Sequence, residues 1–347
     1  MGITKRTKWP IAISVIFCLF LVAGAVGYGL YRMAVGANFH PTHTLYIYVD
    51  DRKDFEDVCR QLTDSAACKD IRSFRWLADI LKYPDAMRTG RYAVDPRMSN
   101  LDLLNNLRRG QQTATRITFN NIRFLEDLTK RLDEQLMLSS ADLLTRLADS
   151  AYCDSLGFDL ETIRCMFIPN TYEVYWNISP DGLLTRMKRE YDNFWTADRK
   201  KKAETIGLTP IEVAILASIV EEETAVADEF PVVAGLYINR LHRGMLLQAD
   251  PTVKYAVGDF MLQRILYAHL EIDSPYNTYI YAGLPPGPLR VPSIQGLNAV
   301  LNYARHNYLY MVAKEDFSGR HNFASTLTEH NRNANRYRQE LNRRNIR

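Results

Sequence analysis

Several familiar catalytic motifs are missing from this sequence. It has no GxxxxGK[ST] or GxGxxG segment to cradle phosphate groups, no HExxH zinc pair and no GxSxG nucleophile elbow. His321 and His330 are too far apart to form a metal pair on one helix. These absences argue against nucleotide-dependent enzymes, zinc hydrolases and serine hydrolases, and we predict no metal and no cofactor. Acid–base catalysis by carboxylate side chains is the enzyme chemistry that the sequence still allows.

Excess charge is also scarce, and so is cysteine. The net charge of +3 over 347 residues is too small to predict nucleic-acid binding, and a composition of 47% hydrophobic and 24% charged residues is typical of globular proteins. The five cysteines include no CxxC pair. Four of them form two pairs of near neighbours in the sequence. In an oxidising compartment we expect two local disulfides, Cys59–Cys68 and Cys153–Cys165.

The longest uncharged run extends from Trp9 to Leu30, with three basic residues before it and Arg32 after it. It is long enough to cross a bilayer. The basic flank predicts a cytoplasmic N-terminus and a plasma (inner) membrane protein whose bulk lies outside the cytoplasm. A cleaved signal peptide is the alternative, because residues 23–25 resemble a cleavage site, although the apolar run is longer than usual for one. We predict a cytoplasmic tail at 1–8 and a transmembrane helix at 9–31.

The rest of the chain predicts an α+β fold. After a spacer come an alternating strand pattern, two helices, a second strand and a helix with Ser99 as its cap and Gly110 as its stop. This order suits a small α+β module. The remainder of the chain is mainly helical, with short strands and long loops, and ends in an arginine-rich stretch that we interpret as a solvated helix face or a tail. The boundaries give a spacer, a module, a main domain and a basic tail: 32–43, 44–112, 113–335 and 336–347.

An apolar helix is predicted to begin at Thr209, with Pro210 in its first turn and Glu212 placed for a capping box. It ends in three carboxylates, Glu221–Glu223, where helices favour cations. Burial and an unfavourable dipole would raise the pKa of such a carboxyl, as a general acid near neutral pH requires. In the alternative interpretation the three acids only mark where the helix leaves the core, and they are solvated.

A long irregular stretch, SPYNTYIYAGLPPGPLRVPS, lies further along the chain. Tyr276, Tyr279 and Tyr281 offer flat faces that suit sugar rings, although a packed connecting loop is the alternative. Acids beside aromatic loops point toward carbohydrate chemistry. One acid suffices where the sugar supplies its own nucleophile, as when the 6-hydroxyl of muramic acid closes a 1,6-anhydro ring. Adjacent helical residues point about 100° apart, so one glutamate of the three would face a cleft.

A resemblance to one family rests on five segments in the family's order: ASIVEEETA, GLYINRL, GMLLQADPTVKYA, SPYNTYIYAGLPPGPLRVPS and HNFASTLTEHN. Together they resemble the YceG-like, or MltG-type, endolytic murein transglycosylases, over roughly residues 40–335. The stretch GRYAVDPRMSNLDLLNNLRRG resembles the family's LysM-like module. The resemblance implies non-hydrolytic cleavage of peptidoglycan between MurNAc and GlcNAc. It also implies a role in ending glycan elongation, with penicillin-binding glycan polymerases as partners.

The same resemblance assigns site residues. Glu223 matches the second glutamate of the family's E-x-E motif and is implied as the general acid and base, with Glu221 in support. Asp250 and Thr252 have an alternative role in capping and bracing a helix. The other motif positions are predicted to support catalysis or bind substrate: Thr224, Asn239, Arg240, Gln248, Asp250, Thr252, Tyr276, Asn277, Thr278, His321, Asn322, His330 and Asn331.

Two further functions remain open from the sequence. One is a non-catalytic envelope scaffold that binds glycan through the small module and the tyrosine-rich loop. The other is a true hydrolase in which Glu223 works with a second carboxylate, either Glu221 or Asp250.

Overall fold

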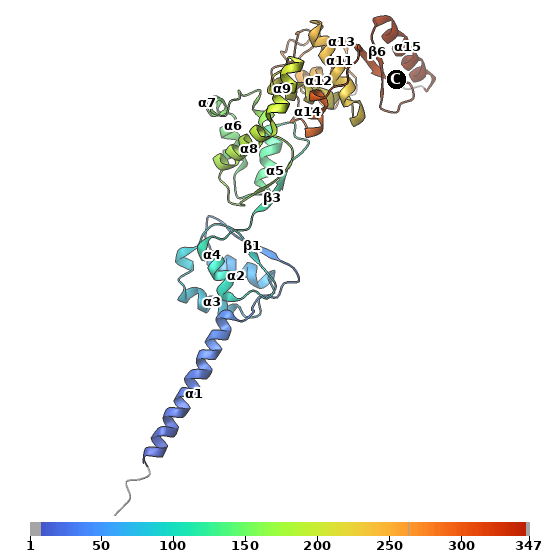
Figure 1. The fold of residues 1–347 in the computed structure, drawn as a ribbon. Coiled ribbons are helices and arrows are strands. Elements are labelled where there is room, and N and C mark those ends of the chain that lie inside the picture. Colours follow the sequence, from blue (N-terminus) through green and yellow to red (C-terminus); the bar gives the residue numbers. More distant parts are fainter. Residues whose placement is uncertain (1–7, 263, 345–347) are drawn as a thin grey trace, which may run out of the picture. The chain divides into compact units, whose positions relative to one another are not determined.

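The computed structural model describes residues 8–262 and 264–344, which form two compact units (Figure 1). The first contains the described residues up to Arg116 together with Glu173–Ile178. The second contains Ile117–Tyr172 and the described residues from Ser179 onward. Both units mix helices with small two-stranded sheets, and helices predominate, so the predicted α+β class is confirmed. The LysM-like assignment of the first unit stays a prediction.

The N-terminal apolar run forms helix α1 (Lys8–Val35). Its segment Ile13–Val35, with a mean hydropathy of 2.3, is long and apolar enough to cross a membrane, and a signal sequence has the same character. The end of α1 joins the first unit, because the carbonyl oxygen of Met33 accepts a hydrogen bond of 2.9 Å from Asn100 Nδ2. Residues 32–35, predicted as spacer, therefore belong to this helix.

The remainder of the predicted spacer also belongs to the first unit. Phe39 is completely buried in its core, where its ring meets Phe74 edge to face. Asn38 Nδ2 donates to Asn100 Oδ1 at 2.7 Å, so these two buried polar groups are hydrogen-bonded to each other. Phe39 is the only large apolar residue of the segment, so the sequence carried too little periodicity to indicate packing.

The first unit is a two-stranded sheet covered by helices. Strands β1 and β2 pair antiparallel, with Leu45 opposite Val94. Helix α4 begins at the predicted cap Ser99, which forms a capping box with Asp102, and ends at Gly110, whose φ of +68° suits a residue without a side chain. The elements of the first unit after α1 are β1 (Leu45–Val49), α2 (Phe55–Asp64), α3 (Ile71–Ile80), η1 (Pro84–Ala86), β2 (Gly90–Val94) and α4 (Asn100–Arg109).

The second unit is mainly helical. Helix α10 (Pro210–Glu223) lies at its centre, packs against α11, α12 and α14, and buries every side chain from Val213 to Val220. Its remaining elements are α5 (Leu125–Asp133), α6 (Ser140–Leu147), α7 (Ser150–Ser155), η2 (Ile163–Met166), α8 (Pro180–Phe194), α9 (Ala197–Ile206), η3 (Ala227–Glu229), α11 (Phe230–His242), α12 (Asp250–Val257), α13 (Tyr267–Leu270), α14 (Ile294–Leu301), β5 (Tyr310–Ala313), β6 (His321–Ala324) and α15 (Leu327–Arg343). Strands β3 (Thr115–Thr118) and β4 (Thr171–Val174) pair with each other, and the division of the chain into units falls within both.

Helix α15 decides between the two interpretations of the arginine-rich stretch in favour of a helix face and moves the start of any tail beyond Arg343. It continues to Arg343, so most of the predicted basic tail is the end of a helix. Its last turn carries an internal ion-pair cluster, in which Arg343 and Arg344 both contact Glu340 at 2.6 Å. The arginines are spread over exposed helical positions, where charge alone does not reveal that the helix goes on.

The two predicted disulfides are absent. All five cysteines lie within residues 8–262 and are free thiols. Cys153 Sγ donates to the carbonyl oxygen of Leu147 at 3.4 Å, and Cys68 Sγ accepts from Asn38 Nδ2 at 3.5 Å. Burial raises the pKa of Cys59 to about 11 and that of Cys165 to about 12. These thiols therefore pack as small apolar groups, and nearness in sequence was not a sufficient sign of pairing.

Candidate active site

The end of α10 forms part of the walls of two cavities in the second unit. Glu223, the last residue of the helix, lines both of them, together with Asp250 and Tyr279. The first cavity has a volume of about 550 Å³ and the second of about 440 Å³. The predicted capping box of Thr209 and Glu212 starts this helix, and Thr224 ends it in an extended conformation. A buried helix thus delivers one carboxyl group to the junction of two hollows.

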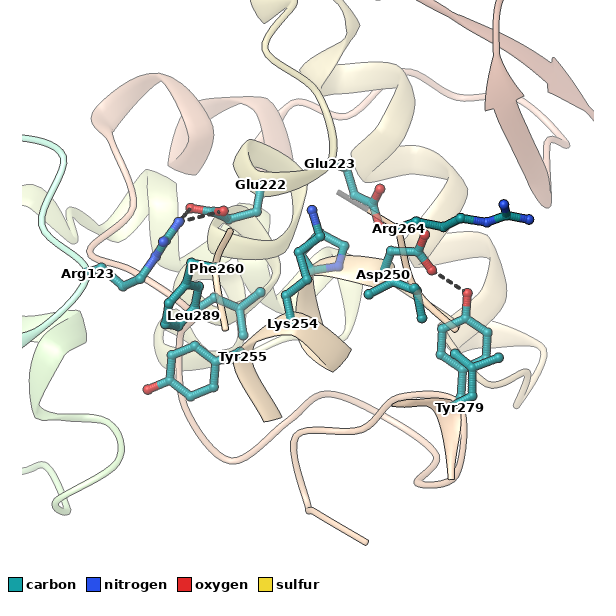
Figure 2. Close-up of a pocket in the computed structure, with 13 residues that line it drawn as sticks. Arg123, Glu222, Glu223, Asp250, Lys254, Tyr255, Phe260, Arg264, Tyr279 and Leu289 are labelled. Carbon is teal, nitrogen blue, oxygen red and sulfur yellow. Dashed lines mark hydrogen bonds and ion pairs between the residues drawn. The ribbon is translucent and has the colours of Figure 1, made fainter. Parts of the chain in front are cut away.

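The three consecutive glutamates have three different environments. The side chain of Glu221 is 7% exposed, accepts from the backbone N–H and the hydroxyl of Ser293, and lines neither cavity. Glu222 accepts two hydrogen bonds of 2.8 Å from Arg123 (Figure 2) and also pairs with Arg290 at 3.2 Å. Among the described residues, Glu223 is the one glutamate of the three that has no cationic partner within 4 Å and that accepts no hydrogen bond from the start of another helix. The interpretation of the triplet as solvated is therefore wrong.

Glu223 is poised to hold a proton near neutral pH. Burial raises the pKa of its carboxyl to about 7, and the nearby negative charge of Asp250 acts in the same direction. The hydroxyl of Tyr237 donates to Glu223 Oε1 at 2.5 Å, which lowers the pKa in part because it stabilises the ionised form. A carboxyl group in this state can donate a proton to a bound substrate at pH 7 and take one back.

Asp250 is the second carboxylate of the site. The hydroxyl of Tyr279 donates to Asp250 Oδ1 at 2.6 Å, and Figure 2 shows this pair beside Glu223. Asp250 was weighed as the cap of α12, but the cap is Ala249 and Asp250 is the first helical residue. Its side chain is free of that task and lies at both cavities.

The first cavity is lined by charged and aromatic groups. The guanidinium of Arg123 lies over the ring of Phe260, 4.2 Å from its centroid, and Phe260 meets Tyr255 edge to face. Lys254 lies between the Arg123–Glu222 pair and Asp250 in Figure 2. Flat rings beside polar groups are suited to sugars, which present both C–H faces and hydroxyls.

The second cavity contains both predicted histidines. The ring of His330 stacks on Tyr310 at 5.4 Å between centroids, and its Nδ1 is buried without a hydrogen-bond partner among the described residues. Burial and the positive charge of Arg240 lower the pKa of His330. His321 lies at the same cavity, and its Nδ1 faces Glu229 Oε2 at 2.9 Å.

Some predicted site residues turn out to stabilise the walls. Arg240 is buried and donates to the carbonyl oxygens of Leu246 and Leu309 and to Gln248 Oε1. It lines the second cavity with Gln248, but its donors are used within the protein. Asn239 holds the carbonyl oxygens of His306 and Tyr308 and reaches neither cavity.

A second group of predicted residues lies behind the walls, outside the lining of both cavities. Buried Thr252 and Thr278 share a hydrogen bond of 2.8 Å that joins α12 to the tyrosine-rich loop. The remaining members are also engaged elsewhere or exposed: Thr224 donates to Glu229, Tyr276 to Glu161, Asn277 to the carbonyl oxygens of Leu270 and Ile272, and Asn322 to Glu315, while Asn331 is exposed on α15.

Other residues of the site were not singled out from the sequence as site residues. Tyr237, Arg123, Lys254 and Glu229 come from α11, from the segment before α5, from α12 and from η3. The sequence did not mark Tyr237 and Glu229 as site residues, because tyrosines are common in apolar helices and acids are common just before helices. Tyr279 was proposed only as one of three sugar-facing rings.

The geometry defines a class of site. One carboxyl with a raised pKa, a second carboxylate nearby and aromatic walls are the features of proteins that act on glycosidic bonds. In the described part of the chain, no group of three or more His, Cys, Asp or Glu side chains gathers that could hold a metal ion.

The family follows from comparison with known proteins. The chain matches the YceG-like family over residues 47–336 and belongs to that family. It is 36% identical over 154 residues to an endolytic murein transglycosylase of Bacillus subtilis, a match that covers 44% of this chain and 41% of the relative. It is 25% identical over 320 residues to an endolytic murein transglycosylase of Streptococcus pneumoniae, with 82% of this chain and 57% of the relative covered.

A solved structure shares the fold. A yceG-like protein from Listeria monocytogenes superimposes with a TM-score of 0.53 at 24% identity, covering 83% of this chain and 98% of that one. The chain spans about half the length of the curated relatives that it matches.

Proposed function

We propose that this protein is a membrane-anchored endolytic murein transglycosylase that cleaves MurNAc–GlcNAc bonds within nascent glycan strands. The observation that carries the proposal is Glu223, a carboxyl with its pKa raised to about 7 at the junction of two cavities. The names of the relatives support the substrate and the reaction.

In the proposed reaction Glu223 donates its proton to the glycosidic oxygen as the bond to C1 of MurNAc breaks. The 6-hydroxyl of the same MurNAc then bonds to C1, gives its proton to the carboxylate of Glu223 and closes the 1,6-anhydro ring, which restores the protonated acid. No water enters, so the reaction is an elimination of the carbon–oxygen lyase type. Asp250, negatively charged beside the site, would stabilise positive charge that develops at C1.

Helix α1 would hold the enzyme at the inner membrane, with its N-terminus in the cytoplasm and the second unit on the outer side. Newly polymerised glycan is still attached to lipid there, so cleavage at this place would end the elongation of a strand. Glycan-polymerising penicillin-binding proteins are the partners that this role requires.

The direct test uses the full chain in detergent with polymerised lipid-linked glycan. We expect shorter strands whose new ends are lighter by one water than hydrolysis products. Glu223→Gln should lower cleavage by about 10³-fold, because it removes the transferable proton. Unaltered glycan with the wild-type chain would reject the enzyme and favour the scaffold, which predicts glycan capture that is indifferent to Glu223.

Hydrolysis is the second candidate, and one observation favours it in a specific form. Glu221 is tied to Ser293 and lines neither cavity, whereas Asp250 lies at both. If water attacked C1, Asp250 would therefore be the second carboxylate. Product mass decides between the two reactions, since a hydrolase leaves reducing ends and no anhydro sugar.

A further inference from the structure

The first cavity contains a lysine that the proposed reaction does not use. Lys254 is half-buried on α12, one turn after Asp250, and lines this cavity. A lysine four residues after an acid on a helix commonly pairs with it. Here Asp250 accepts from the hydroxyl of Tyr279 instead. The ammonium group of Lys254 forms no ion pair or hydrogen bond with the described residues, so it is available to a ligand.

The other charged groups of the first cavity are paired or exposed. Glu222 accepts from Arg123, and Arg264 is exposed. When Glu223 is protonated, the described lining carries three cations and two carboxylates, so positive charge is in excess. The second cavity differs, because Arg240 in its lining donates to groups within the protein. An anionic ligand is therefore better suited to the first cavity.

Lys254 also lies close to the proton donor. Figure 2 shows it between the Arg123–Glu222 pair and Asp250, and Glu223 lines the same cavity. Burial raises the pKa of Glu223 to about 7, and the positive charge of Lys254 opposes this shift in part. A group that binds to Lys254 would therefore belong to a sugar at or beside the bond that Glu223 cleaves.

The glycan carries a suitable anion on one of its two sugars. GlcNAc is uncharged, whereas MurNAc has a lactyl ether at O3. In a glycan without peptides the lactyl carboxylate is free. In a glycan with peptides it is an amide, and the stem peptide supplies the carboxylates instead. In both cases the negative charge belongs to the substituent at O3 of MurNAc.

We propose that Lys254 binds a carboxylate of the substituent at O3 of MurNAc and so brings this sugar to the first cavity; this rests on the proposed transglycosylase function. The contact is an ion pair and changes no covalent bond. It makes Lys254 a specificity-determining residue, which favours murein over uncharged glycans such as chitin.

The experiment removes the charge from each side of this contact. Full-length wild type and Lys254→Met are assayed in detergent on polymerised lipid-linked glycan, with its carboxylates free or capped as methylamides. We expect capping to raise the KM of wild type about tenfold with kcat changed less than about threefold, because a charge-assisted contact to bound glycan is lost. Lys254→Met should show the raised KM on both glycans. Lys254→Arg, which keeps the charge, should retain the preference for free carboxylates.

A matched control and a second glycan sharpen the result. Lys200→Met removes an exposed lysine of α9 that lines neither cavity, and it should keep the wild-type preference. Glycan from which an amidase has removed the peptides identifies the carboxylate, when each glycan is compared with its own capped form. A preference that depends on Lys254 with stripped glycan assigns the lactyl carboxylate, and one with peptide-bearing glycan assigns the stem.

Two outcomes would overturn the inference. One is a wild-type KM that does not respond to capping on either glycan, and the other is a response that persists in Lys254→Met. Thermal unfolding shows whether each variant is folded, and the comparison of capped with free glycan on wild type needs no substitution. Dissociation constants of Glu223→Gln, with and without Lys254→Met, measure the same preference in the absence of cleavage. A wild type that cleaves no glycan would instead reject the proposed function, so the two failures are distinguishable.

Discussion

Helices α1 and α10 are both strongly apolar, yet the side chains of α1 are exposed and those of α10 are buried. In α1 large apolar residues such as Phe20 are exposed, at 74%, whereas Leu216 and its neighbours in α10 are completely buried. Hydropathy alone does not separate them. Basic residues flank α1, but α10 begins at a capping box and ends in three acids. The ends of an apolar helix therefore say more about its surroundings than its middle does.

The end of α10 shows why acids can close a buried helix. Two of them are satisfied within the protein, Glu221 by Ser293 and Glu222 by two arginines. The third, Glu223, is left with a tyrosine hydroxyl and a raised pKa. The unfavourable position at the end of the helix therefore leaves one carboxyl, that of Glu223, without a cationic partner among the described residues.

The sharpest way to test the contrast between the helices is a matched pair of truncations. Leu216→Ala should destabilise the second unit by about 2–5 kcal/mol, because it opens a cavity in the core. Leu21→Ala, at a residue that is 58% exposed in α1, should change that unit's stability by less than about 0.5 kcal/mol. Denaturant unfolding of the full chain in detergent measures both. Equal effects would mean that the two helices do not differ in burial.

Local chemistry predicted most elements, because caps and stops act within a few residues. The start of α10 and both ends of α4 follow from Thr209, Ser99 and Gly110 and are confirmed. Long-range features were out of reach. Nothing near residues 173–178 indicates that this segment returns to the first unit, and Phe39 alone does not reveal that a spacer is folded.

The sequence led to several residues that line the cavities, but it did not distinguish them from residues that only stabilise the cavity walls. The resemblance led to Glu223, Asp250 and His321, which all lie at the cavities. Glu222 and Glu223 both line the first cavity, and only Glu223 also lines the second. Helix geometry could not decide this, because the placement of the three side chains depends on Ser293 and Tyr237 from other elements. Motif positions such as Asn239 turned out to hold backbone carbonyls, a role that motif matching cannot distinguish from substrate binding.

The pairing of Glu221 gives the next prediction. Ser293→Ala removes the hydroxyl that bonds Glu221 and also caps α14 through Gly296. We expect a loss of about 1–3 kcal/mol in the free energy of unfolding. The matched control is Ser179→Ala, which removes an equivalent cap over Gly182 without touching an acid and should cost about 1 kcal/mol.

The two serine variants should also differ in pH dependence. Burial raises the pKa of Glu221, so its contribution to stability is lost as pH rises through the folded-state value. The hydroxyl of Ser293 favours the ionised form, and its removal should enlarge the deficit toward higher pH. If the deficits of Ser293→Ala and Ser179→Ala stay equal from pH 4 to pH 8, Glu221 is not supported by Ser293.

The smallest effect concerns Glu223 itself. Tyr237→Phe removes the hydrogen bond that stabilises its carboxylate, so its pKa should rise above about 7. Activity that needs a protonated Glu223 should then persist to higher pH, and the alkaline limb of the cleavage profile should move upward while the rate at pH 6 changes only a few-fold. Tyr172→Phe, which removes a buried hydroxyl bonded to the carbonyl oxygen of Ile168, should leave that limb in place. A limb that moved downward would mean that Tyr237 favours the neutral acid, and the raised pKa at the end of α10 would then have a different cause from burial.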